Sequence, residues 1–213
     1  NTFGVTLSAL GQEYPVELED VVETPLDVVF VLDVSGSMQT KVSGKSRAQA
    51  MVDAVNTSMK EILDQNPHNR VGVVIYSSGS WDLLELGRYS QSNNQYLRTQ
   101  TISGNSWKSG RYNVLAGTNL KVTDDSGKIY DVSGADQANG TYTQAGIARG
   151  ANMLMRSTPK TYTEILYEGT ESEQSVTVRR QPVIILLSDG EPTHATNIYM
   201  DPISGPHYGD GQG

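Results

Sequence analysis

Cysteine is absent from this sequence, which excludes both a disulfide framework and a thiolate metal site. Basic residues are few: 16 Lys and Arg stand against 24 Asp and Glu, and the formal net charge is -8. This balance disfavours nucleic acid and anionic membranes as partners, because both attract positive charge. Long apolar runs are also missing. The longest, residues 28–32 and 183–187, are far shorter than the roughly 20 residues that span a bilayer, so we expect no membrane insertion.

The chain of 213 residues is long enough for one substantial core. We expect one main domain at residues 26–213. Before it, apolar and polar residues alternate over residues 3–9 and 14–18, which predicts a hairpin. Residues 1–25 are therefore an appended hairpin or the edge of a preceding domain.

The stretch LDVVFVLDVSGSM is the feature around which the rest of the chain is organised. Its first half, residues 26–32, is an apolar run rich in β-branched residues, which predicts a strand buried on both faces of a parallel sheet. Asp33, Ser35 and Ser37 follow at alternate positions, where the strand ends. Because ligands bind at the carboxyl edge of open α/β sheets, we expect these oxygen side chains to lie where a ligand binds.

A helix and two further strands are predicted after this stretch. Ser46 and Gln49 have the spacing of a capping box, and apolar residues then recur every three or four positions until Asn66. Residues 71–76 form a second apolar run, and residues 81–86 alternate as an edge strand does. The order strand, helix, strand favours a parallel crossover.

The next region, residues 88–140, is rich in Ser, Asn, Gly, Thr and Tyr and has few aliphatic residues. Connections in α/β units usually take about two to six residues, so we interpret this region as an insertion. Within it, residues 120–122 and 129–132 flank a turn-prone Asp-Asp-Ser-Gly sequence, which predicts a hairpin.

Aromatic residues set among Ser, Asn and Gly are typical of antigen-binding loops. On this pattern we name Trp107, Tyr112 and Tyr142 as candidate ligand-binding residues. A decorative loop without a role in recognition is the alternative.

Helical periodicity returns after Thr143, which we expect to be the cap of its helix. Residues 157–181 form a second polar excursion, with a short strand predicted at residues 176–178. The apolar run at residues 183–187 predicts a second fully buried strand, which ends in a Ser-Asp-Gly sequence. We expect the Gly- and Pro-rich residues 196–213 to form an irregular, flexible tail.

Three separated stretches offer oxygen ligands at strand ends or helix starts, and one sheet edge can gather them. They contribute Asp33, Ser35, Ser37, Thr141 and Asp189. Hydroxyls and carboxylates are hard oxygen donors, and a set with only two acids suits Mg²⁺ better than a dedicated Ca²⁺ cage. Magnesium keeps several waters, so such a site leaves a position for an incoming carboxylate.

The segments DVSGS, GTYT and LSDGEP occur in this order and resemble the metal-ion-dependent adhesion site of the von Willebrand factor A (vWA) domain family. The resemblance covers residues 26–195 and implies a three-layer α/β/α, Rossmann-like domain with a mainly parallel central sheet and a long insertion before the threonine segment. It implies Mg²⁺ as the ion, with Mn²⁺ or Ca²⁺ as substitutes. The ion would be held, directly or through water, by Asp33, Ser35, Ser37, Thr141 and Asp189.

The insertion and its Gly-, Ser- and Asn-rich style look most like the surface and pilus-tip adhesins of Gram-positive bacteria. This resemblance implies an adhesion module that grips an acidic side chain of a host matrix or cell-surface protein, located at the cell surface or in the cell wall. The alternative is an intracellular vWA scaffold that assembles with an ATP-driven, chelatase-like machine. A signal peptide or wall-anchoring signal in the full-length chain would decide between them.

We expect no enzymatic activity. Phosphotransferases with an aspartyl nucleophile after the first strand place a second Asp two residues later as the acid, and that position here is Ser35. The family's sheet needs further strand and helix units after Asp189, each of about 30 residues, whereas 24 residues (213 minus 189) follow it. We therefore expect the chain to be truncated at its C-terminus.

Overall fold

The computed structural model describes residues 22–103, 109–132, 140–190, 192–193, 198–201 and 205–208. Its centre is a four-stranded sheet with the strand order β12-β1-β4-β5. The strands are β1 (Leu26–Asp33), β4 (Arg70–Tyr76), β5 (Ser80–Gly87) and β12 (Gln181–Leu187). β1 pairs in parallel with β4 and β12, and β5 runs antiparallel along β4, so the predicted mainly parallel sheet is confirmed.

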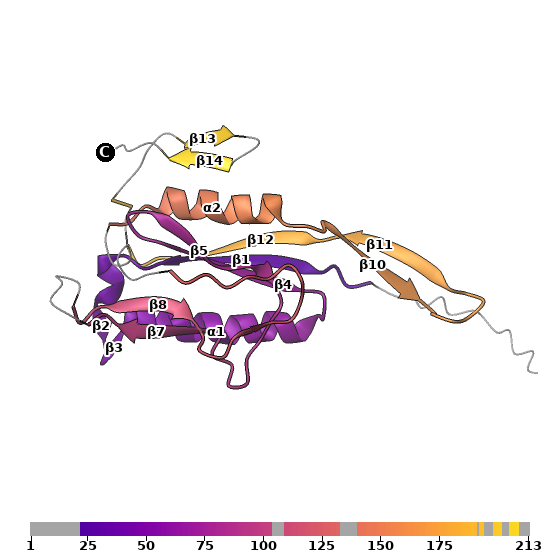
Figure 1. Ribbon diagram of the computed structural model, residues 1–213, viewed down its shortest axis with the longest axis horizontal. Coiled ribbons are helices and arrows are strands. Elements are labelled where there is room, and N and C mark those ends of the chain that lie inside the picture. The colour runs from indigo at the N-terminus through magenta and orange to yellow at the C-terminus, as the bar shows by residue number, and fades with distance from the viewer. Residues whose placement is uncertain are drawn as a thin grey trace, which may run out of the picture.

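Two helices cover the faces of this sheet. In Figure 1, α1 (Arg47–Gln65) lies below the sheet and α2 (Thr143–Arg156) lies above it. The predicted three-layer α/β/α arrangement is therefore confirmed.

β1 is buried on both faces of the sheet, as predicted. On one face, Val28, Phe30 and Leu32 belong to the apolar cluster that contains the buried residues of α1. On the other face, Val29 and Val31 pack in the cluster beneath α2. The β-branched run thus supplies side chains to two cores at once, which explains why it is apolar at consecutive positions.

α1 begins and ends where the sequence predicts, after Ser46 and before Asn66. The Ser46 hydroxyl accepts a hydrogen bond from the Gln49 backbone N–H at 3.1 Å, and the Gln49 side chain accepts one from the Ser46 N–H at 3.0 Å. This capping box satisfies two backbone donors that a helix start leaves free. The helix ends before Asn66, as predicted.

α2 packs close to the sheet because two of the residues that face it are glycines. A Cβ atom on Gly146 would lie 2.6 Å from Cδ1 of Tyr76, and a Cβ atom on Gly150 would lie 2.8 Å from Cγ2 of Val31. Larger side chains at these positions would push α2 away from β1 and β4.

The described residues of the predicted insertion include four short strands. They are β6 (Tyr89–Ser90), β7 (Leu97–Thr101), β8 (Tyr112–Ala116) and β9 (Lys121–Val122). β7 and β8 form an antiparallel hairpin that packs against α1. The Asn56 side chain on α1 donates to the Leu97 carbonyl at 2.9 Å and accepts from the Leu97 N–H at 2.7 Å, which docks the hairpin onto the helix.

The hairpin predicted between residues 120–122 and 129–132 is wrong. β9 pairs with β6 instead, and Ile129 forms a bridge to Leu84 on the edge strand β5. Further backbone hydrogen bonds join β5 to the chain around Ile129. The open edge of β5 therefore pairs with the segment that the hairpin would have used, which covers part of that edge.

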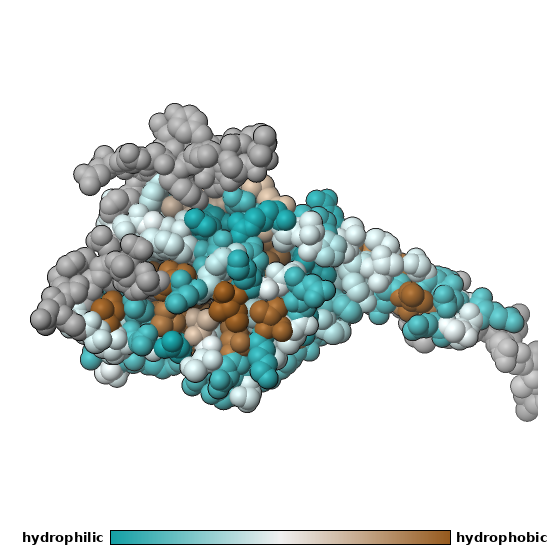
Figure 2. Space-filling view, viewed as in Figure 1, coloured by the Kyte–Doolittle hydropathy of each residue, from teal (hydrophilic) through white to brown (hydrophobic). Residues whose placement is uncertain are grey.

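A two-stranded arm forms most of the second polar excursion. Its strands β10 (Thr161–Leu166) and β11 (Gln174–Arg179) are antiparallel and project beyond the helices in Figure 1. The strand predicted at residues 176–178 is confirmed as part of β11, whereas β10 was not predicted. Figure 2 shows mainly hydrophilic and intermediate residues on the visible face of this arm.

The prediction that residues 183–187 are fully buried is wrong. Ile184 and Leu186 are 36% and 42% exposed, because β12 is an end strand with β1 on one side only. In the tail that we expected to be irregular, β13 (Ile198–Asp201) and β14 (Gly205–Tyr208) form an antiparallel pair. The N-terminal hairpin predicted within residues 3–18 lies outside the described residues.

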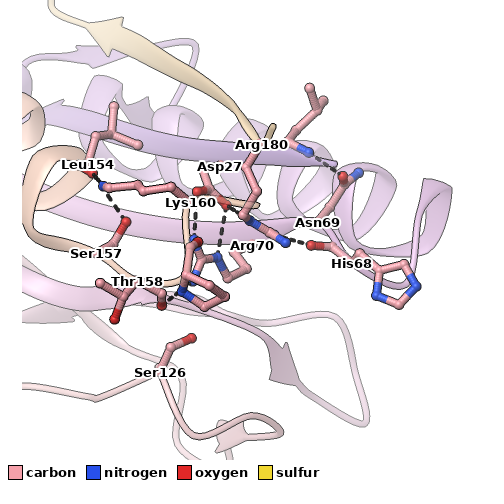
Figure 3. A network of polar contacts seen from close by, with 12 residues as sticks. Asp27, His68, Asn69, Arg70, Ser126, Leu154, Ser157, Thr158, Lys160 and Arg180 are labelled. Atoms are coloured by element: carbon pink, nitrogen blue, oxygen red, sulfur yellow. Dashed lines mark hydrogen bonds and ion pairs between the residues drawn. The ribbon is translucent and has the colours of Figure 1, made fainter. Parts of the chain in front are cut away.

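A buried ionic cluster joins the strands at the end of the sheet opposite Asp33 (Figure 3). The carboxylate of Asp27 accepts hydrogen bonds from Arg70 at 2.9 and 2.7 Å and from Arg180 at 2.8 Å. All three side chains are nearly inaccessible to solvent, so each charge depends on the others. A cavity of about 660 Å³ lies beside the two arginines.

Replacing Gly146 with alanine tests the close packing of α2. Alanine stabilises an ordinary helix by about 1 kcal/mol relative to glycine, but here its methyl group clashes with Tyr76. We expect Gly146→Ala to lower the free energy of unfolding by about 1–3 kcal/mol in urea denaturation. Asn152→Ala in the same helix is the control and should be neutral or stabilising. A Gly146→Ala variant at least as stable as wild type would contradict the packing account.

Candidate metal centre

The carboxyl ends of three parallel strands lie level at one edge of the sheet. In the strand register, Asp33 at the end of β1 is paired with Tyr76 at the end of β4, and the preceding Leu32 is paired with Leu187 at the end of β12. The two segments that follow β1 and β12 therefore begin side by side. They are far apart in the sequence, because Asp33 and Ser188 are separated by 155 positions.

A chain of hydrogen bonds joins four of the five predicted ligands. Asp33 is fully buried, and its Oδ1 accepts from the Ser35 N–H at 2.8 Å. The hydroxyls of Ser35 and Ser37 are 3.0 Å apart, and the Ser37 hydroxyl donates to Oδ1 of Asp189 at 2.7 Å. The second oxygen of Asp33 accepts from the Ser188 hydroxyl at 2.7 Å. Two acids and three hydroxyls thus form one cluster.

The backbone after β1 turns tightly to make this cluster. Residues Gly36–Gln39 form a short 3₁₀ helix, η1, which carries Ser37 and buries Met38. The Val34 N–H donates to the Tyr76 carbonyl at 2.8 Å, which extends the pairing of β1 and β4 by one residue before the turn. Burial raises the pKa of the Tyr76 hydroxyl, so this side chain stays neutral beside Asp33.

Thr141 reaches the same edge through the backbone rather than through that chain of side chains. The N–H of the next residue, Tyr142, donates to the Ser77 carbonyl just after β4 at 2.7 Å. The Thr141 N–H donates to the Thr193 hydroxyl at 2.8 Å, and the Thr193 N–H donates to the Thr141 carbonyl at 3.0 Å. The predicted cap at Thr143 is wrong: Tyr142 is the cap residue, without a side-chain cap bond, and Thr143 begins the helix.

An arginine contacts the acid from β12. The guanidinium of Arg47, the first residue of α1, donates to Oδ2 of Asp189 and forms an ion pair with it. The side chain of Arg47 is 42% exposed, whereas that of Asp189 is only 11% exposed. The cluster therefore holds two carboxylates and one guanidinium.

The three candidate ligand-binding aromatic residues have different positions. Tyr142 is only 7% exposed, so it has little surface to offer a ligand. Tyr112 lies on β8, and its backbone N–H and carbonyl bond the Gln39 side chain of η1 at 2.6 and 3.3 Å. Trp107 lies outside the described residues.

Three residues at this edge were not predicted. Ser188 directly precedes Asp189 in the sequence, so its place beside a predicted ligand was a usable signal. Thr193 follows in the same segment. Arg47 is 142 residues from Asp189 along the chain, and no motif connects the two.

The residues present fit a hard divalent cation. Two carboxylates with several neutral hydroxyls form the oxygen-donor set that Mg²⁺ accepts. Within the described part of the chain, no group of three or more His, Cys, Asp or Glu residues is placed to hold a metal, so a site here must rely on hydroxyls. The cluster at the sheet edge is the place that offers them.

Residues 28–110 match the family model of the von Willebrand factor type A domain. Over these residues the chain is similar to that family. The match includes β1, η1, α1, β4 and β5, and therefore the segment that carries Asp33, Ser35 and Ser37. A comparison with curated proteins found no match.

Several solved structures of pilus proteins are similar to this chain. The open conformation of the pilus adhesin SpaC from Lactobacillus rhamnosus GG has 20% identity and a TM-score of 0.46, over 89% of this chain and 18% of that one. The adhesive tip pilin GBS104 from Group B Streptococcus agalactiae has 20% identity and a TM-score of 0.46, over 86% and 31%. The pilus adhesin RrgA from Streptococcus pneumoniae has 18% identity and a TM-score of 0.40, over 80% and 21%. This chain spans less than a third of each of these proteins.

Across the described residues, no helix is both long enough and apolar enough to cross a membrane.

Proposed function

We propose that this vWA domain binds Mg²⁺ at the carboxyl edge of its sheet and uses the ion to grip an acidic side chain of a protein ligand. The proposed ligands of the ion are Asp33, Ser35, Ser37, Thr141 and Asp189. The observation that carries the proposal is the hydrogen-bonded cluster of two acids and three hydroxyls formed by segments far apart in the sequence.

The chemistry of this cluster suits a bound ion that keeps an open position. Magnesium takes near-octahedral oxygen coordination, and with few protein carboxylates it retains several waters. A carboxylate from a partner can replace one such water. The Ser37 hydroxyl lies within hydrogen-bond distance of both the Ser35 hydroxyl and the Asp189 carboxylate, so the three oxygen donors are already close together.

The acidic character of the chain does not oppose this mode of binding. The formal net charge is -8, but charges on a protein surface are screened beyond about 8 Å at physiological salt. A bound divalent cation is the largest local charge in its site and dominates the interaction with a carboxylate at contact distance.

We propose that the insertion contacts the same ligand. The two bonds between the Gln39 side chain and the Tyr112 backbone join η1 directly to β8. The β7–β8 hairpin therefore lies beside the segment that carries Ser37, and a partner held at the ion would meet it. This position supports recognition by the insertion rather than decoration.

We infer that the ligand is a host matrix or cell-surface protein and that the domain acts in adhesion at the bacterial surface. This part of the proposal is supported by the vWA family match and by the three sequence segments that resemble an adhesion site.

Metal binding is tested by thermal unfolding of the metal-stripped chain with added Mg²⁺ or Mn²⁺. A ligand that binds only the folded state stabilises it by about 2.7 kcal/mol at roughly one hundred times its Kd, so we expect a concentration-dependent rise in Tm. Asp33→Ala should remove the rise. Asp64→Ala, which deletes an exposed acid at the far end of α1, is the control and should keep it. No rise in wild type, or an equal rise in Asp33→Ala, would sink the metal proposal.

Adhesion is tested with immobilised host matrix proteins. We expect at least one of them to bind the domain in Mg²⁺, to lose the domain in EDTA and to regain it when Mg²⁺ is restored. Amidation of the carboxyl groups on that matrix protein should abolish binding, because the ion would have no carboxylate to hold. If every interaction found survives EDTA, or if amidation has no effect, the acidic-side-chain mechanism is wrong.

A further inference from the structure

Arg47 occupies a position that helix stability alone does not explain. It is the first residue of α1, where the helix macrodipole is positive and favours acidic side chains. A cation there is electrostatically unfavourable for the helix. Its side chain instead turns to the sheet edge, where it pairs with Oδ2 of Asp189.

The two acids of the cluster have different partners. Asp33 accepts hydrogen bonds from neutral donors, the Ser35 N–H and the Ser188 hydroxyl. Asp189 accepts one bond from the neutral Ser37 hydroxyl and one from the charged guanidinium of Arg47. Arg47 therefore cancels one of the two negative charges that a divalent cation would otherwise meet.

We propose that Arg47 is a tethered cation that competes with the divalent metal for Asp189 and so lowers the metal affinity of the site. The inference rests on the proposed metal binding and adds a residue that is outside the ligand set. When the metal binds Asp189, the guanidinium leaves this carboxylate. The Arg47 side chain is 42% exposed, so water can solvate the released guanidinium and the free-energy cost of its release is small.

The size of the effect follows from the exposure of the pair. The Arg47 side chain is 42% exposed, although that of Asp189 is only 11% exposed. Solvent around the guanidinium weakens the pair, and a modest contribution of this kind corresponds to a change of roughly two- to fivefold in an equilibrium constant. We therefore expect a measurable shift in metal affinity rather than a switch between binding and no binding.

The test is calorimetric titration of Mn²⁺ and of Mg²⁺ into the metal-stripped full chain. We expect Arg47→Gln to bind each metal roughly two- to fivefold more tightly than wild type. Arg47→Lys keeps the positive charge and should stay closer to wild type. Arg179→Gln is the matched control, because it removes the same charge from the exposed surface of β11, near the opposite end of the sheet, and should match wild type.

Salt supplies a second readout that a purely structural role of Arg47 would not give. The difference between wild type and Arg47→Gln should shrink as ionic strength rises from about 0.05 to about 1 M, because the Debye length falls to about 3 Å at the higher value. Circular dichroism confirms that each variant is folded.

The outcomes separate this inference from the proposed function. If wild type binds metal and Arg47→Gln binds it equally or more weakly, Arg47 does not compete and this inference is overturned, while the metal site stands. If wild type binds neither metal, the proposed function fails and the inference fails with it.

Discussion

The parallel pairing of β1 between β4 and β12 is the constraint on which the rest of the structure depends. It brings the ends of three strands to one edge and places Asp33 where it is fully buried. A buried carboxylate is costly unless its oxygens accept hydrogen bonds. The turn after β1 and the segment after β12 supply those donors, from Ser35 and Ser188, so the need to satisfy one acid organises both loops.

The parts of the fold that follow from local periodicity could be predicted from the sequence. The apolar run of β1 and the capping box at Ser46 each encode one element in a few adjacent residues, and both are as expected. The predictions that proved wrong concern segments whose structure depends on a partner far away in the sequence. Ile129 joins β5 instead of a local hairpin, and Ile184 is exposed because β12 is an end strand, which no apolar run reveals.

In the candidate site, too, some residues could be predicted from the sequence and others could not. Asp33, Ser35 and Ser37 lie close together in the sequence, and the topology of a parallel sheet predicts that Asp189 meets them, as the structure shows. Arg47 could not be predicted in this way, because a single arginine at a helix start carries no pattern and its contact depends on how α1 packs on the sheet. The charge balance of the site is therefore a property of the tertiary structure.

Anomalous diffraction from crystals grown with Mn²⁺ tests the central claim most directly, because it locates the ion without reference to stability or adhesion. The account predicts an anomalous peak at bonding distance from the hydroxyls of Ser35 and Ser37, at the edge where Asp33, Thr141 and Asp189 meet. Crystals of the folded domain without a peak at this edge, or with the metal held by other residues, would contradict it.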